Sequence, residues 1–482
     1  MLDLRPVGYV VGLLIVALGC AMIVPMIADL ANEGTNWDPF AVSAAISVFT
    51  GGAMAAACAD RRTAGLSIQQ AFLFTTLAWL LLPVFGGLPF VLGQPNASYV
   101  DGFFEAMSGL TTTGATVFRG LDELPQGVNL WRGMLQWFGG VGIVVFAMAF
   151  LPTLRVGGMQ LFKSESFDTF GKILPRAAEI AQSISWIYVG LTAVCAVSYV
   201  AAGMSTFDAT MHAMTTVSTG GFASRDASFG AFSPMAQYLA VVFMILAALP
   251  FVRFVQIMAG SARPLFKDPQ IHAFIGTALA AVIAMAAYRS FSLGSFSEEA
   301  FRASLFNVVS ILTGTGYASA DYSNWGAFPV ALIFIIGLIG GCAGSTSCSI
   351  KVFRYQVLFA AVVTQINRLH MPHGVFTPRY AGRPVEEDVI SSVMSFVFFF
   401  FLTFGAVAVI LSMIGLDTIT AISGAASAIA NIGPGLGPEI GPAGTFQGLP
   451  DSAKWVLAIT MLIGRLELLA VFVLFTPTFW RP

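Results

Sequence analysis

The hydrophobic pattern along the chain alternates long apolar stretches with shorter, weakly apolar ones. Stretches long enough to cross a bilayer as helices lie at 7–30, 39–58, 68–92, 131–151, 180–202, 234–258, 270–292, 328–349, 386–415 and 455–477. Shorter pieces lie at 101–112, 208–219, 300–314 and 418–431. At about 1.5 Å of rise per residue, such a piece reaches only halfway across the hydrocarbon core. Because non-helical backbone at membrane depth is tolerated only inside protein or beside water, we expect these pieces to line a pore as re-entrant segments.

The short segments repeat one sequence pattern. The segments are DGFFEAMSGLTTTG ending at Gly114, DATMHAMTTVSTGG ending at Gly221, ASLFNVVSILTGTG ending at Gly316 and TAISGAASAIANIG ending at Gly433. A hydroxyl column, made of Ser108, Thr215, Ser310 and Ser427, runs through all four. We therefore predict four units of span, half-helix, loop and span after two additional N-terminal helices. The predicted bounds are 1–60 for the two N-terminal helices and 61–155, 156–262, 263–364 and 365–482 for the repeats.

The composition indicates a membrane protein. Of the 482 residues, 57% are hydrophobic and 10% are charged, whereas soluble domains carry roughly 25% charged residues. We predict an all-α polytopic membrane protein that is surrounded by lipid. The net charge of −2 gives no sign of a nucleic-acid partner. The five cysteines lie mostly in apolar segments, which favours free thiols over a disulfide framework.

The basic residues predict the orientation. Sixteen lysines and arginines, including Lys351 and Arg354, fall on one side of the predicted spans, and six, including Arg132 and Lys454, fall on the other. The richer side is expected to be cytoplasmic, which places both termini there. Arg465 belongs to neither side because it lies inside a predicted span.

The glycine column has the chemistry of a cation filter. Rings of backbone carbonyls can replace the hydration shell of a potassium ion, and pointing them inward needs backbone angles that glycine tolerates. Acidic residues near the starts of the half-helices (Asp101, Asp208, Glu298/Glu299 and Asp417) favour helix dipoles whose negative ends face the pore. A single loop of this kind is more often a packing motif, but four in register favour a pore. The predicted filter residues are Thr112, Thr113, Gly114, Thr219, Gly220, Gly221, Gly314, Thr315, Gly316, Asn431, Ile432 and Gly433.

Several motifs resemble one family. They are TTTGAT, TVSTGGF, TGTGYAS, NIGPGLG, GGCAGSTSCSIKVFR at 340–354 and GRLE at 464–467. Over the whole chain the sequence resembles the Trk/Ktr/HKT superfamily of potassium transporters, most closely its bacterial TrkH branch. The resemblance implies a pseudo-fourfold, potassium-selective pore in a homodimer in the bacterial inner membrane. It also implies gating by a cytoplasmic nucleotide-binding partner that is similar to TrkA.

The segment IIGLIGGCAGSTSCSIK is the predicted gate. Its glycines and its Ser/Thr run disfavour a continuous helix. The resemblance implies an intramembrane loop that blocks the pore, although a kinked helix packed through small residues fits the residues alone equally well. Ser347, Cys348 and Ser349 stand where related proteins often have more glycine. The predicted gate residues are Gly341, Cys342, Ala343, Gly344, Ser345, Thr346, Ser347 and Arg465.

Arg465 is expected to face the pore, because a charge inside a span usually faces an aqueous cavity or a partner. The resemblance implies that it raises the barrier to cations beside the gating loop, and a purely structural arginine is the alternative. Glu467 lies two residues on, so it is not expected to pair with Arg465. Three acidic residues, Asp226, Asp321 and Glu439, are candidates for raising the cation concentration at the outer mouth.

The predicted function is channel-like potassium uptake, with potassium as the transported ion. A sodium- or proton-coupled symporter on the same scaffold is the alternative, and a polytopic membrane enzyme is a third possibility. The hypothesis of a membrane enzyme lacks support because no cluster of catalytic residues is apparent at membrane depth. A coupled carrier needs acidic groups near the midplane, where only Arg465 is expected. Since the chain has no nucleotide motif, we expect no organic cofactor, and we predict that the partner docks on the basic loops 163–176 and 368–383.

Overall fold

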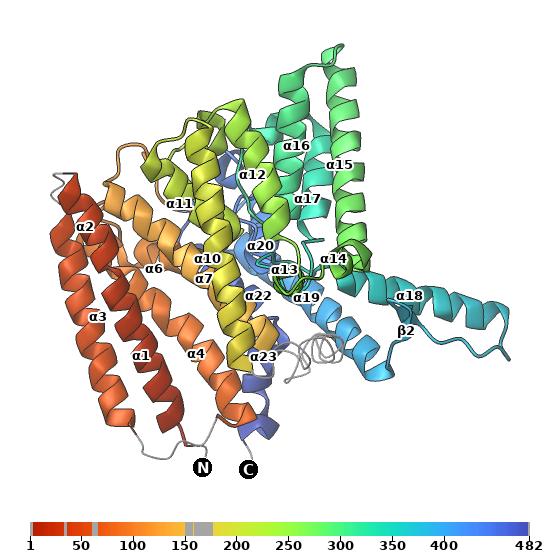
Figure 1. Cartoon of the computed structure of the whole chain (residues 1–482), viewed down its shortest axis with the longest axis horizontal. Helices are drawn as coiled ribbons and strands as arrows, with labels where there is room; N and C mark the ends of the chain where they lie inside the picture. Colours follow the sequence, from red (N-terminus) through yellow and green to blue (C-terminus); the bar gives the residue numbers. More distant parts are fainter. Residues whose placement is uncertain (1–2, 33–35, 60–65, 150–157, 159–176, 481–482) are drawn as a thin grey trace.

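The computed structural model describes residues 3–32, 36–59, 66–149, 158 and 177–480. These residues form a helical bundle whose first helix begins at the same end of the molecule as the last one ends (Figure 1). Within these ranges, six helices are long and apolar enough to cross a membrane, or eight if two bent pairs each count as one span. The predicted all-α membrane fold is confirmed.

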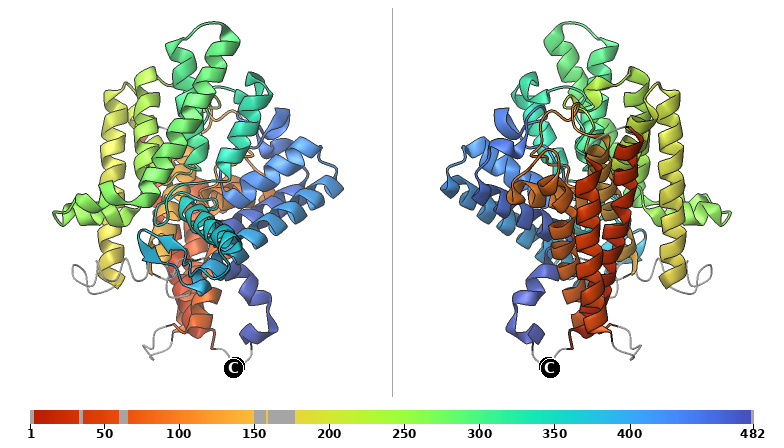
Figure 2. Two further views of the ribbon diagram at one scale, coloured as in Figure 1. Left: turned by 90° about the vertical axis from the view of Figure 1, so that its right-hand side faces the viewer. Right: turned by 90° about the vertical axis from the view of Figure 1, so that its left-hand side faces the viewer.

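Three helices form the N-terminal part, α1 (Arg5–Ala21), α2 (Ile23–Ala31) and α3 (Trp37–Cys58). α1 packs along α3 because Gly12 and Gly51 leave room for the two backbones to touch. A Cβ atom on Gly12 would lie 2.7 Å from the carbonyl oxygen of Gly51. Figure 2 shows α1 and α3, in red, lying across one face of the bundle.

The remaining helices follow the predicted order of long and short segments. The long and connecting helices are α4 (Ile68–Gly86), α5 (Leu88–Leu92), α7 (Gln126–Ala149), α10 (Ala177–Ala201), α12 (Pro234–Ala247), α13 (Phe251–Met258), α14 (Arg263–Lys267), α15 (Pro269–Leu293), α17 (Ala327–Gly337), α18 (Val352–His370), α19 (Glu387–Ile414), α21 (Gly437–Ile440), α22 (Asp451–Arg465) and α23 (Leu469–Phe472). The short helices before the glycines are α6 (Tyr99–Leu110), α11 (Thr206–Val217), α16 (Glu298–Leu312) and α20 (Thr418–Ala430). The 3-10 turns are η1 (Ser228–Ala231), η2 (Tyr322–Trp325), η3 (Phe446–Gly448), η4 (Val473–Phe475) and η5 (Pro477–Trp480).

Each short helix packs against a helix of the preceding repeat. α11 contacts α7, α16 contacts α12 and α20 contacts α17. α6 closes the circle by contacting α22 of the last repeat. The chain therefore arranges its four short helices around one axis in sequence order.

Three predicted spans are interrupted, which corrects the sequence prediction. The 234–258 span bends by 89° between α12 and α13, because Pro250 cannot continue the ladder of the preceding helix. The 328–349 span ends at Gly337, and coil follows up to Lys351. The 455–477 span bends by 103° after Arg465, where Glu467 and Leu468 adopt positive φ angles of 61° and 45°.

The segment that contains the predicted docking loop 368–383 is partly ordered secondary structure. α18 extends through its first part as far as His370, and two short antiparallel strands, β1 (Arg379–Tyr380) and β2 (Arg383–Pro384), occupy its second part. In their register Tyr380 lies opposite Arg383. Figure 1 shows α18 projecting from the side of the bundle.

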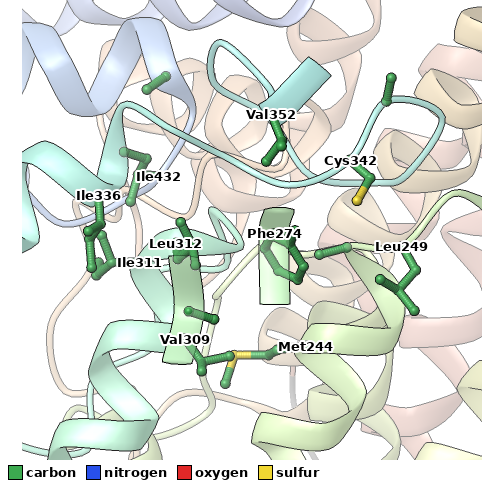
Figure 3. Packing of buried hydrophobic residues seen from close by; sticks show 14 of the residues in the cluster. Met244, Leu249, Phe274, Val309, Ile311, Leu312, Ile336, Cys342, Val352 and Ile432 are labelled. Carbon is green, nitrogen blue, oxygen red and sulfur yellow. The ribbon is translucent and has the colours of Figure 1, made fainter. Parts of the chain in front are cut away.

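The largest apolar cluster joins the second and third predicted repeats to the coil after α17. Figure 3 shows part of it, with Met244 and Leu249 near the α12–α13 bend and Ile311 and Leu312 at the end of α16. Cys342 belongs to the same cluster and is fully buried. The coil is therefore packed into the protein core, where backbone at membrane depth must be satisfied by other protein groups.

Candidate functional site

All four short helices begin with a side-chain cap. Ser98, Ser205 and Ser297 accept hydrogen bonds from backbone N–H groups of the first turn, and Asp417 does the same for α20. Asp101 and Asp208 lie in the first turns, next to the positive ends of their helix dipoles. The negative helix ends therefore point toward the glycine loops, which follow directly.

The four glycine loops share one backbone conformation. The chain takes a positive φ angle just after each short helix, at Thr112 (51°), Thr219 (51°), Gly314 (75°) and Asn431 (52°). Two residues later it does so again, at Gly114 (87°), Gly221 (82°), Gly316 (83°) and Gly433 (104°). The left-handed region that other residues can adopt lies near φ angles of about 50–70°, which fits the threonines and the asparagine at the first position. The larger φ angles at the second position favour glycine.

The same hydrogen bond closes each short helix. In each repeat the backbone N–H of the residue before the glycine donates to the backbone carbonyl of the residue that belongs to the hydroxyl column. The four N···O pairs are Thr113 to Ser108 (2.9 Å), Gly220 to Thr215 (2.8 Å), Thr315 to Ser310 (2.9 Å) and Ile432 to Ser427 (3.1 Å). The sequence repeat thus corresponds to a repeat in hydrogen bonding, which includes the fourth loop despite its different side chains.

The four loops contact one another in a closed ring. A Cβ atom built on Gly114, Gly221 or Gly316 would overlap a carbonyl oxygen of the next loop, namely that of Gly220, Thr315 or Ile432. A Cβ atom on Gly433 would lie 2.8 Å from the carbonyl oxygen of Thr113, which closes the ring. The Asn431 side chain also joins the last loop to the first, because its Nδ2 donates to Thr113 Oγ1 at 2.9 Å. All twelve predicted filter residues belong to this ring.

A cavity of about 420 Å³ opens on one side of the ring and is lined by all four glycines. Asp226 lines it, and its carboxylate accepts hydrogen bonds from the N–H groups of Gly120 and Leu121 at 2.9 and 3.0 Å. Asp321 and Glu439 do not line this cavity, so they are not brought to the site with Asp226. Arg225 also lines it, and a hydrogen bond to Asp208 raises the pKa of its guanidinium.

The coil 338–351 lies against the opposite side of the ring. Ser347 Oγ donates to the carbonyl of Thr313 at 2.6 Å and accepts from the N–H of Gly341 at 2.9 Å. Thr112 Oγ1 lies 3.9 Å from Cys348 Sγ. The coil therefore contacts the loops of the first and third repeats directly.

The coil is also anchored by hydrogen bonds to the backbone at the break between α12 and α13. The N–H of Cys342 donates to the carbonyl of Ala248 at 3.0 Å, and the carbonyl of Gly344 accepts from the N–H of Phe251 at 2.9 Å. Thr346 Oγ1 donates to the carbonyls of Val217 and Ala247. The break between α12 and α13 thus supplies hydrogen-bond partners to the coil, so the two interruptions belong to one arrangement.

Arg465 touches the coil, as the predicted gate set requires. It is 4% exposed, and its Nη1 donates to the carbonyl of Thr346 at 3.3 Å and contacts Cys348 Sγ. Its Nε has no hydrogen-bond partner among the described residues. The guanidinium is therefore held beside the coil by few contacts.

Glu467 is the centre of a buried charge cluster, which corrects the expectation that Arg465 is the only strong charge at this depth. Its carboxylate pairs with Lys351 Nζ at 2.8 Å and with the Arg354 guanidinium. Lys351 and Arg354 were expected in a solvated cytoplasmic segment, yet they are 6% and 0% exposed. The cluster joins the end of the coil to the break after α22, and it confirms that Glu467 is not a partner of Arg465.

Two further charged pairs are buried. Arg132 Nε lies 2.7 Å from Glu105 Oε1, with both side chains fully buried, and Lys454 Nζ lies 2.6 Å from Asp101 Oδ1. The sequence predicted only that Arg132 and Lys454 lie on the non-cytoplasmic side, near the starts of two predicted spans, and it did not predict their carboxylate partners. One sequence signal could have found the first pair, because Glu105 interrupts a segment that was predicted to lie inside the membrane.

The structure describes one of the two predicted docking loops. The loop 163–176 lies outside the described residues. In the loop 368–383, Arg368 Nη2 donates to the carbonyl of Phe376 at 3.0 Å, which folds this segment back on itself.

Comparisons with known proteins agree over nearly the whole chain. The family model TrkH, described as a cation transport protein, matches residues 40–481. The Trk system potassium uptake protein TrkI of Halomonas elongata is 43% identical over 99% of this chain and 97% of its own length. The Trk system potassium uptake protein TrkH of Vibrio parahaemolyticus is 38% identical over the full length of both chains. The crystal structure of the potassium transporter TrkH from Vibrio parahaemolyticus matches with a TM-score of 0.91 and 35% identity over all of both chains.

Proposed function

The chain belongs to the TrkH family and is a transporter of Trk potassium uptake rather than an enzyme, and on this premise we propose that the ring of glycine loops is its potassium filter. The closed ring carries the proposal. Each glycine packs against the carbonyl group of the next loop, so the four loops hold one another at a fixed spacing. A fixed ring of carbonyl oxygens can replace the water shell of potassium, which is the requirement for selective passage.

The coil 338–351 and Arg465 form the gate in this proposal. Ser347 and Cys348 lie directly against the base of the loops, and the guanidinium adds a positive charge there. A cation leaving the filter meets both a steric block and a like charge in the low-dielectric interior, where such repulsion is strong. The hydrogen bonds to Ala248 and Phe251 hold the coil in this blocking position.

Passive, channel-like passage fits this site better than ion-coupled transport. A coupling ion at membrane depth is often bound by an available acidic side chain. Four buried carboxylates lie around the loops and the coil, and each is already paired with arginine or lysine. They are Glu105, Asp208, Asp268 and Glu467. A sodium- or proton-coupled symporter stays the alternative, and a dependence of potassium flux on a sodium or proton gradient would favour it.

Three further parts of the proposal concern the cell. The protein works in the bacterial inner membrane with both termini in the cytoplasm, as a homodimer. A TrkA-like nucleotide-binding partner opens the gate from the cytoplasmic side. Charge reversal in 368–383 is expected to weaken binding of this partner, and unchanged binding would exclude the loop as its docking surface.

The test is potassium and sodium flux in proteoliposomes that hold this protein alone. Wild type is compared with Gly114→Ser and with Gly52→Ser, a matched control in α3 where a Cβ atom meets nothing within 4 Å. We expect potassium-selective flux in wild type and control, and lost selectivity in Gly114→Ser. Equal potassium and sodium flux in all three proteins would contradict the filter.

A further inference from the structure

We propose that Glu105 and Arg132 are positioning residues that determine the ion selectivity of the filter, by holding the chain segments after the first and second glycines together. The inference rests on the proposed filter. Neither residue lies among the twelve filter positions, and neither touches the ring carbonyls.

Glu105 lies behind the first loop. It is fully buried on α6, and its Oε2 accepts a hydrogen bond from the backbone N–H of Val117 at 2.9 Å. The Thr116 hydroxyl donates to the same carboxylate at 2.8 and 3.1 Å. The carboxylate therefore fixes the segment that leaves Gly114.

Arg132 extends this anchor to the second repeat. Besides its ion pair with Glu105, its Nη1 donates to the carbonyl of Ala223 at 2.8 Å, and its guanidinium lies 4.4 Å from the centre of the Phe222 ring. One turn further along α7, Gln136 donates to the carbonyl of Gly220 at 2.6 Å. α7 thus holds the second loop while Glu105 holds the first.

The other repeats have a related anchor without a buried charge pair. Position three after the glycine is Val117, Ser224, Ser319 or Leu436. In the third repeat the N–H of Ser319 donates to Asn307 Oδ1 at 3.2 Å, and in the fourth the N–H of Leu436 donates to Ser423 Oγ at 2.9 Å. In the second, the Ser224 hydroxyl donates to Asp208 at 2.6 Å, and Asp208 pairs with Arg225, whose side chain is 40% exposed.

The first repeat therefore differs in one respect that concerns function. Its anchor is an ion pair with both side chains fully buried, and its cation binds the neighbouring repeat inside the protein, so it determines the spacing between two loops as well as the shape of one. A guanidinium has fixed fork geometry and can hold both partners at once. Because a filter discriminates between ions through the placement of its oxygens, the fork should act on selectivity more than on the rate of passage.

The deciding experiment compares Arg132→Lys with Arg302→Lys. Lysine keeps the charge beside Glu105 but loses the fork that reaches Ala223. Arg302 pairs with Glu298 in the first turns of α16 and is the control; its side chain is 14% exposed and that of Glu298 is 60% exposed. We expect Arg132→Lys to keep potassium flux and to lose about tenfold in its potassium-to-sodium permeability ratio, whereas Arg302→Lys keeps the wild-type ratio.

Glu105→Gln is the second variant, because it preserves the size of the side chain and removes the charge. We expect the same loss of selectivity in it. If Glu105→Gln does not yield folded protein in detergent, the Arg132→Lys ratio decides. A wild-type ratio in folded Arg132→Lys would overturn the inference and leave the filter intact, whereas an unselective wild type would contradict the filter itself.

Discussion

The filter glycines are required for two separate physical reasons. Each has a positive φ angle, and each lacks room for a Cβ atom next to a carbonyl of the adjacent loop. A left-handed backbone costs a residue with a side chain roughly 1–2 kcal/mol, which a folded protein tolerates, but the steric overlap must shift the carbonyl itself. The second reason therefore connects a single residue to the geometry of the whole ring.

Gly316→Ala should accordingly lose selectivity while the protein still folds. Its Cβ atom would displace the carbonyl oxygen of Ile432, so we expect the potassium-to-sodium permeability ratio to fall by about tenfold or more. Reversal potentials in planar bilayers or proteoliposomes measure this permeability ratio. Gly276→Ala is the control, because a Cβ atom there meets nothing within 4 Å. An unchanged ratio in Gly316→Ala would show that the carbonyl contact has no role in discrimination.

The glycine column was predictable from the sequence, whereas its anchors were not. The same glycine occurs in four repeats, and this repetition distinguished the filter glycines from glycines that only allow close packing. Glu105 inside an apolar segment signals a buried carboxylate, but nothing local identifies Arg132, 27 positions away, as its partner. Glu467 was separated from Arg465 by an argument from helix geometry, yet α22 ends at Arg465 and Glu467 lies in the break after it. Its partners, Lys351 and Arg354, lie more than 110 positions away.

Among the elements, the coil 338–351 combines an irregular backbone with specific hydrogen bonds. It lacks helical hydrogen bonds, yet several of its polar groups bond to Ala248, Phe251 and Thr313. The buried Ser349 hydroxyl has no partner among the described residues. Such a segment can leave its place only by breaking a limited number of hydrogen bonds. This property suits the gate that we propose.

Ser347→Ala should therefore make the gate leak. The change removes the hydrogen bond to Thr313, and a net hydrogen bond contributes about 0.5–1.5 kcal/mol. We expect potassium flux without any partner to rise between about twofold and tenfold. Flux through Ser198→Ala, whose exposed hydroxyl bonds only within α10, should stay at the wild-type level. A Ser347→Ala variant with wild-type or lower flux would exclude this contact from gating.

The break after α22 is held by charge. Glu467 and Lys351 both have positive φ angles, of 61° and 73°, and their ion pair joins the two strained positions. The sequence predicted a continuous span because no proline marks this bend, and a single glycine such as Gly464 does not by itself end a helix. Long-range pairing outweighs local helix propensity here, which a local pattern cannot reveal.

Glu467→Gln should destabilise the protein markedly. It leaves Lys351 and Arg354 buried without a counter-charge, and breaking a buried pair costs roughly 3–5 kcal/mol. Thermal unfolding in detergent should show a clearly lower midpoint. Glu298→Gln, in the exposed pair with Arg302, should cost less than about 1 kcal/mol and change the midpoint little. Equal midpoints for the two variants would mean that the cluster does not hold the break.

The whole molecule is a ring that the chain closes in sequence order. Each short helix packs against the preceding repeat, and the contact between Gly433 and Thr113 joins the last repeat to the first. The membrane class, the order of elements and the short helices followed from hydrophobic pattern and repetition. The glycines and the Ser/Thr run after Gly337 signalled one interruption, but the bends after α12 and α22 were not predicted. Pro250 accounts for the first bend, whereas the second depends on Lys351 and Arg354, which are distant in sequence.

The direct test of this account is to locate the ion. Crystals of the protein grown in rubidium, a potassium substitute, would show the bound ion by its anomalous scattering. The account predicts density on the axis of the ring, between the carbonyl groups next to Gly114, Gly221, Gly316 and Gly433. Ordered rubidium elsewhere in the membrane-spanning region, with none inside an intact ring, would contradict the claim that these loops form the filter.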